Sequence, residues 1–150
     1  MHRIALRGIG TLVFVAVLVT LAGCAGPIFR VKVVNEGDFS LTSVRLIPYL
    51  EDEEAQAQAF ADAVNLMPRD AEENTIPLEA EKITLLPHLL EGKRYYVEVK
   101  YYVDDAYVEK VWDSILDLTE IEKNALVTMY VRCAVATGAT EPTFSFYFEY

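Results

Sequence analysis

Histidine and cysteine are the residues from which nucleophilic and metal chemistry is most often built, and this chain has two of each. Nucleophilic catalysis needs a base beside the nucleophile, usually histidine, and a zinc site gathers several cysteine and histidine ligands. His2 lies near the N-terminus, and His88 stands alone in a loop-like stretch after Pro87. The sequence contains no Gly-x-Ser-x-Gly and no Ser-x-x-Lys motif. We therefore predict no catalytic residue, no metal site and no cofactor.

Carboxylates form two dense runs, at residues 51–54 and 70–73. Calcium loops combine closely spaced oxygen ligands with a glycine at the turn, and neither run contains a glycine. A pair of carboxylates can hydrolyse a glycosidic bond, but spacing in the sequence does not give their separation in space. We interpret the runs as a helix start and an acidic loop. A small hydrolase or glycan-acting enzyme and a calcium-binding module are the alternatives.

Nine tyrosines form the third group of interest. Alternation places Tyr96, Tyr102 and Tyr107 on the more polar faces of their predicted strands. Tyrosine offers contact area and a hydroxyl group at a low cost in entropy. We predict that these three residues form an interaction surface for a protein or a glycan. Alternatively, the helix or a second sheet covers this face, or cross-strand aromatic pairs stabilise it.

The first 23 residues have the organisation of an export signal. Arg3 and Arg7 are their only charged residues among Lys, Arg, Asp and Glu, and residues 9–21 form a run of 13 without charge. A basic start, an apolar stretch of this length and small residues after it are typical of a secretory signal peptide. The small residues belong to the segment Leu21-Ala22-Gly23-Cys24.

Leu21-Ala22-Gly23-Cys24 resembles the lipobox of bacterial lipoproteins, and it lies at the end of the apolar run, as in that family. The resemblance implies a diacylglycerol on the Cys24 thiol, cleavage before Cys24 and often acylation of the new amine. Two or three acyl chains hold a protein durably at a membrane, whereas one chain binds only marginally. The resemblance places the protein in the bacterial envelope. Because Ala25 and not Asp follows the cysteine, it favours the outer membrane where the host has two membranes.

An uncleaved transmembrane anchor is the alternative to a cleaved signal, because residues 8–29 carry no charge and are long enough to span a bilayer. Plain secretion is a further alternative. Gly23, Gly26 and Pro27 disfavour the spanning helix, because all three fall in the last third of this stretch.

Cleavage before Cys24 separates two unlike parts of a chain that is 53% hydrophobic and carries a formal charge of −10. Residues 24–150 keep 11 Lys and Arg against 23 Asp and Glu, a formal charge of −12. Such a domain is expected to stay soluble beside an anionic membrane and to bind no nucleic acid. Cys133 lies on an apolar alternating face, so we predict a core cysteine.

Alternation with a period of two, which is typical of β-strands, recurs along residues 29–150. Residues 106–118 fit a helix or a strand, and Asp104-Asp105 before them favours a hairpin turn and a strand. Acidic residues in a first turn and Pro68 beyond the end predict a helix over residues 51–66. The remaining strands are expected at residues 29–33, 40–48, 94–103, 124–135 and 143–150.

Six or seven strands with one short helix indicate a mainly β fold, an antiparallel β-sandwich of Ig-like or transthyretin-like architecture. A curled sheet packed against the helix is the alternative. We expect a signal peptide over residues 1–23, a lipidated N-terminus and tether over 24–28, and one sandwich domain over 29–150. The expected function is that of a lipid-anchored structural or partner-binding module, not an enzyme.

Overall fold

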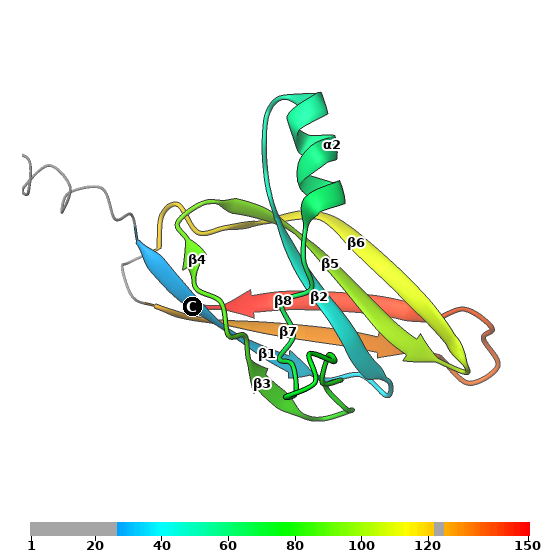
Figure 1. Ribbon diagram of the computed structural model, residues 1–150. Coiled ribbons are helices and arrows are strands. Elements are labelled where there is room, and N and C mark those ends of the chain that lie inside the picture. The colour runs from blue at the N-terminus through cyan, green and yellow to red at the C-terminus, as the bar shows by residue number, and fades with distance from the viewer. Residues whose placement is uncertain (1–26, 122–124) are drawn as a thin grey trace, which may run out of the picture.

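The computed structural model describes residues 27–121 and 125–150 of the chain. This part folds as two facing sheets with one short helix (Figure 1), which confirms the predicted β-sandwich. The elements are, in order, β1 (Ile28–Asn35), β2 (Ser40–Pro48), α2 (Glu53–Asp62), β3 (Ile83–Leu85), β4 (Leu90–Glu91), β5 (Arg94–Val103), β6 (Ala106–Asp117), β7 (Leu126–Ala134) and β8 (Thr143–Glu149).

One sheet, which we call the β7 sheet, has the order β3-β1-β7-β8, and β4 pairs with the start of β1. The other, the β5 sheet, has the order β2-β5-β6. All strand pairs are antiparallel except β1 and β7, which run parallel with Val31 opposite Val127. The sandwich is therefore antiparallel, as predicted, except at this one pair. Parallel neighbours need a long crossover, and here the whole β5 sheet lies between them in the sequence.

The core lies between the sheets and is filled by alternate residues of the long strands. Cys133 is fully buried, as predicted, and burial raises the pKa of its thiol to about 11. The thiol is therefore protonated at neutral pH. Other fully buried core residues are Phe29, Val31 and Val33 of β1, Val97, Val99 and Tyr101 of β5, and Val127, Met129 and Val131 of β7.

Residues 106–117 form a strand, so the hairpin interpretation is confirmed. Asp104 and Asp105 form its turn with φ angles of 45° and 65°. Two-residue hairpin turns favour positive φ because their twist then matches that of the strands, and Asp tolerates this conformation.

The helix is shorter than the predicted span of residues 51–66. Asp52 caps its start, because the side-chain carboxylate accepts a hydrogen bond from the Ala55 amide at 2.8 Å. The helix ends at Asp62, and Ala63 is already extended. The next residues follow β2 instead, where the Leu66 amide donates to the Val44 carbonyl at 2.8 Å. No helix in the described part of the chain is long and apolar enough to cross a membrane.

Candidate interaction surfaces

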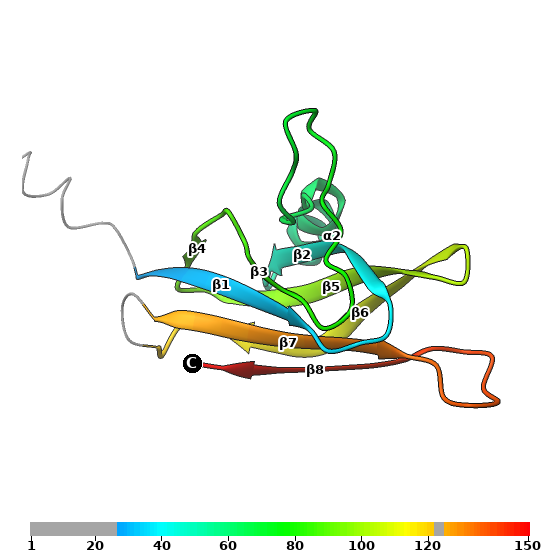
Figure 2. The ribbon, with the colours of Figure 1, turned by 90° about the horizontal axis from the view of Figure 1, so that it is seen from below.

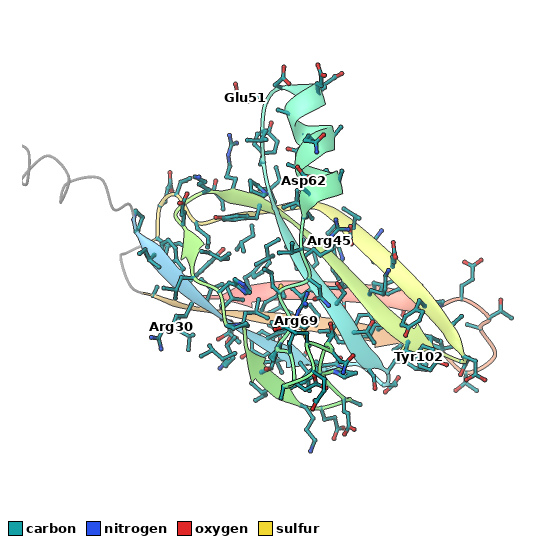
Figure 3. The ribbon with its side chains drawn as sticks, in the orientation of Figure 1. Arg30, Arg45, Glu51, Asp62, Arg69 and Tyr102 are labelled. Atoms are coloured by element: carbon teal, nitrogen blue, oxygen red, sulfur yellow. The ribbon has the colours of Figure 1, made fainter. Side chains whose placement is uncertain are left out.

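Tyr102 and Tyr107 form an exposed cross-strand pair on the outer face of the β5 sheet. Their ring centroids lie 5.1 Å apart, and the two residues are 42% and 67% exposed. The Tyr102 hydroxyl donates to the Asp105 carboxylate at 3.2 Å. The pair therefore stands at the β5–β6 turn, at one end of the sandwich (Figure 3).

Tyr96 does not share this surface, although it lies on the same face of β5. Its ring packs 5.5 Å from that of Phe60 in α2 and 5.8 Å from that of Tyr49. Ile47, its cross-strand neighbour on β2, is fully buried on the outer face. Helix α2 covers this end of the sheet, which is the alternative that the sequence left open for Tyr96.

An ion pair between a partly buried arginine and a buried glutamate lies under the C-terminal end of the helix. The Arg45 guanidinium contacts the Glu98 carboxylate at 2.7 Å, and Glu98 is only 7% exposed. The same guanidinium donates to the backbone carbonyls of Phe60 and Ala63. Figure 3 shows Arg45 near the Asp62 end of α2. Because every partner in this cluster is structural, we interpret it as the group that holds the helix on the sheet.

The outer face of the β7 sheet carries an apolar and aromatic row that the sequence analysis missed. Ile83, Val34, Tyr130 and Tyr147 are successive cross-strand neighbours on β3, β1, β7 and β8. Neighbouring strands lie about 4.8 Å apart, so this row extends about 14 Å across the sheet. Ile83 is 61% and Tyr147 is 48% exposed. We call these four residues the aromatic stripe. Helix α2 lies on the other sheet (Figure 2).

The two tyrosines of the stripe are stacked and hydrogen-bonded. Their rings are nearly parallel, at 7°, with centroids 4.5 Å apart. The Tyr130 hydroxyl donates to Glu149 at 2.7 Å, and the Tyr147 hydroxyl donates to Glu36 at 3.2 Å. The hydrogen bond to Glu149, followed by partial desolvation, raises the pKa of Tyr130 to about 12. Both rings are thus held in place, which lowers the entropy that they would lose on binding a partner.

Three basic side chains flank the stripe on the same face, Arg30 and Lys32 from β1 and Arg132 from β7. Among the described residues, none of the three forms a salt bridge. Four other basic residues do, each with a carboxylate: Arg45, Arg69, Lys93 and Lys100. The outer face of the β7 sheet therefore joins an apolar centre with three basic side chains and with the two carboxylates, Glu36 and Glu149, that accept from the tyrosine hydroxyls.

A signal for this surface was present in the sequence. Tyr130 alternates with buried residues and shares its face with Thr128 and Arg132, as Tyr147 does with Ser145 and Glu149. This is the same pattern that singled out Tyr96. Alternation does not give the register between β7 and β8, which places Tyr130 beside Tyr147.

The two acidic runs serve local backbone structure. Asp52 caps α2, and Asp70 accepts hydrogen bonds from the amides of Glu72 and Asn74. The pKa of Asp70 is lowered, mainly by the hydrogen bond from the Asn74 backbone amide. Within residues 27–121 and 125–150, no three His, Cys, Asp or Glu residues gather where they could hold a metal ion. His88 is exposed in the loop between β3 and β4.

Cys24 and the predicted signal peptide lie outside the described residues. Comparisons of the chain with protein families, curated protein sequences and solved structures gave no match. Function is therefore inferred from the sequence motif and from the geometry of the sandwich.

Proposed function

We propose that this protein is a lipoprotein of the bacterial cell envelope, held at the membrane by acyl groups on Cys24, and that its sandwich binds another envelope protein. The position of Leu21-Ala22-Gly23-Cys24 at the end of an apolar run supports the anchor. The observation that carries the binding role is the aromatic stripe, an ordered and partly exposed apolar row on a sheet face that no described helix covers.

The aromatic stripe supports binding better than the Tyr102–Tyr107 pair does. It draws a side chain from each of four neighbouring strands, and both of its tyrosine hydroxyls have acceptors, whereas in the other pair only Tyr102 donates to an acceptor among the described residues. Preordered aromatic residues at the centre of a patch are typical of the residues that dominate binding energy. The Tyr102–Tyr107 pair, by contrast, adjoins the acidic turn Asp104-Asp105 and lies beside the Lys100–Glu109 ion pair.

The charges on the β7 sheet define the kind of partner. Around the stripe, Arg30, Lys32 and Arg132 outnumber Glu36 and Glu149, the two carboxylates that accept from the tyrosine hydroxyls. A complementary protein surface is therefore apolar at its centre and acidic where it meets the basic side chains. Rim charges act mainly on the association rate and are screened by salt. We therefore expect association to slow as the ionic strength rises.

Photo-crosslinking in living cells tests the binding role. A photoreactive amino acid at Ser145, which is exposed beside Arg132 on this face, is expected to trap one discrete partner. The same amino acid at Tyr107, on the other sheet, is the matched control. Changing Tyr130 and Tyr147 to alanine is expected to weaken binding by at least about 2 kcal/mol, roughly 30-fold, and to remove the adduct. Equal adducts at positions 145 and 107, or an adduct unaffected by the alanines, would contradict this role.

Metabolic labelling with radioactive palmitate tests the anchor. The wild-type chain is expected to incorporate label and to fractionate with the outer membrane of a host that has two membranes. The Cys24→Ala variant is expected to remain unlabelled. Equal labelling of the two chains would exclude acylation at Cys24, whatever the outcome of the crosslinking.

A further inference from the structure

Exposed apolar side chains gather at the end of the sandwich where β1 begins. In both ribbon views the starts of β1 and β7, the β4 segment and the C-terminus lie at this end (Figures 1 and 2). We call the four side chains the apolar tip. They are Ile28 at 42% exposed, Leu89 at 58%, Leu126 at 46% and Tyr150 at 64%.

Strand pairing brings these residues to one end from four separate segments. Leu89 directly precedes β4, which pairs with Ile28 and Phe29 of β1. Leu126 lies opposite Arg30 at the start of β7. Tyr150 follows Glu149, the last residue of β8. The cluster is therefore a product of the fold and not of one apolar stretch of sequence.

The tether is short enough to bring this end to the membrane. Ile28 is four residues after Cys24. A fully extended chain spans at most about 3.6 Å per residue, so the start of β1 lies within about 14 Å of an acylated Cys24. Acyl chains on Cys24 hold that residue at the bilayer interface.

We propose that the apolar tip is a membrane-contact surface that rests in the headgroup region of the bilayer. This inference depends on the proposed lipid anchor. Tyrosine is enriched at membrane interfaces because its ring is apolar and its hydroxyl is polar, and Tyr150 is placed to serve in this way. The exposed apolar side chains of Leu89 and Leu126 then move from water to the boundary between the headgroups and the acyl chains.

The distribution of charge agrees with this orientation. Asp104 and Asp105 lie in the β5–β6 turn at the opposite end of the sandwich (Figure 1). At the tip end, the Glu91 carboxylate is paired with Lys93. Hydrogen bonds from Thr119 are the main cause that lowers the pKa of Asp117, and the nearby charge of Arg94 adds to the effect. Basic side chains thus offset two of the carboxylates at this end, whereas among the described residues neither Asp104 nor Asp105 forms a salt bridge, so the tip meets an anionic leaflet with less repulsion than the far turn does.

The orientation also fixes how the binding surface is presented. The long strands run away from the membrane, and ten residues of β5 extend about 33 Å. The aromatic stripe lies partway along the β7 sheet, so its face stands sideways to the membrane. A partner can then approach it parallel to the bilayer.

An environment-sensitive label tests the membrane contact in the full chain. Leu89→Cys and Leu126→Cys report on the tip, and Tyr107→Cys, at 67% exposed in the wild type, is the control at the far end. Each variant is labelled with nitrobenzoxadiazole and reconstituted into phosphatidylethanolamine–phosphatidylglycerol vesicles. The native Cys133 should not react, because it is fully buried and its pKa is about 11.

At positions 89 and 126 we expect label emission in vesicles to be several-fold higher than in the protein without vesicles or detergent. Lipids that carry a spin label near the headgroup are expected to quench this emission. At position 107 we expect neither change. In a Tyr150→Cys chain, adding Leu89→Glu and Leu126→Glu is expected to abolish the rise. Adding Val64→Glu, at a site 60% exposed away from the tip, is expected to leave it intact.

Mass spectrometry of Cys24 separates the two ways in which this inference can fail. If Cys24 carries its acyl groups and positions 89 and 126 behave like position 107, the tip does not touch the membrane, although the anchor stands. If emission rises but spin-labelled lipid does not quench it, a protein surface or a second copy covers the tip, and the inference is wrong. If Cys24 carries no lipid, the tether argument is lost and the inference falls together with the anchor.

Discussion

The outer faces of the two sheets differ in what covers them. On the β5 sheet, Ile47 is fully buried beneath α2, whereas on the β7 sheet Ile83 is 61% exposed. Both are isoleucines on outward-facing strand positions, so residue type does not explain the difference. The helix explains it, yet the helix itself has no buried residue.

Polar contacts therefore hold helix α2 on the β5 sheet. Arg45 reaches the carbonyls at the end of α2, and near its start Gln56 donates to the Pro48 carbonyl and accepts from the Leu50 amide. A ten-residue helix is too short to be stable alone, so these contacts and the Phe60 ring must keep it on the sheet. The β7 sheet has no comparable anchor among the described residues, and none of the described elements covers its outer face.

Substituting Arg45, which holds α2 on the β5 sheet, is expected to have the largest effect on the difference between the two sheets. Arg45→Met leaves Glu98 buried without its partner and two helix carbonyls without their donor. We expect a loss of about 3 kcal/mol in the free energy of unfolding, measured in urea, because an unpaired buried charge is strongly destabilising.

The double variant Arg45→Met with Glu98→Leu is the control for this prediction. Replacing both members of a buried pair by apolar residues is often close to neutral, so we expect it to recover part of the loss. The helix carbonyls stay without a donor in both variants. If the double variant were less stable than Arg45→Met alone, the unpaired Glu98 would not be the cause of the loss.

A matched pair of alanine substitutions measures the cover directly. We expect Ile47→Ala to cost about 2 kcal/mol, because it removes a fully buried side chain beneath a thin cover that can settle into the space. Ile83→Ala, on the open face, is expected to stay within about 0.5 kcal/mol of the wild type. Equal losses in urea unfolding would mean that the two faces do not differ in stability.

The sequence predicted the strands well because each long strand has one buried face. The span 94–103 matches β5, and the aspartates before residue 106 correctly favoured a hairpin over a helix. Strands β3 and β4 were missed, because two or three residues are too few for alternation to show. Where the helix ends could not be predicted, since Arg45 from another element binds its last carbonyls.

The candidate surface depended on information that alternation does not carry. Alternation places Tyr96 and Tyr130 alike on the polar faces of their strands, but it does not say which face a helix will cover. The stripe further requires the parallel pairing of β1 with β7, which joins residues about 100 positions apart. Cys24 rests on the sequence motif alone and stays a prediction.

Removing the N-cap of α2 is expected to have a smaller effect, confined to the helix that covers the β5 sheet. Asp52→Ala removes the carboxylate that accepts from the Ala55 amide, and we expect a loss of about 1 kcal/mol in helix stability. Hydrogen exchange of the α2 amides is expected to quicken while that of β7 and β8 is unchanged. An equal change in α2 and in β7 and β8 would show that α2 opens only with the whole domain.

The smallest effect concerns the open face and is confined to high pH. The pKa of Tyr130 is raised to about 12, chiefly by its hydrogen bond to Glu149, whereas an unfolded tyrosine ionises near pH 10. Below pH 10 the phenol is neutral in both states, and its contribution to stability is fully present. As the pH rises from about 10 to about 12, the unfolded chain releases this proton first, so the folded state loses stability.

Glu149→Gln tests this assignment, because glutamine keeps an acceptor but removes the charge. We expect the pKa of Tyr130 to move back toward 10. The pH dependence of its ring-carbon chemical shifts, assigned to single tyrosines, measures this change. Glu36→Gln, which changes the acceptor of Tyr147 at 3.2 Å, is the matched control and is expected to move Tyr130 less. If the two variants shifted the pKa of Tyr130 equally, the phenol would be responding to the charge of both nearby carboxylates alike. The hydrogen bond that holds its ring in the stripe would then not be the dominant cause.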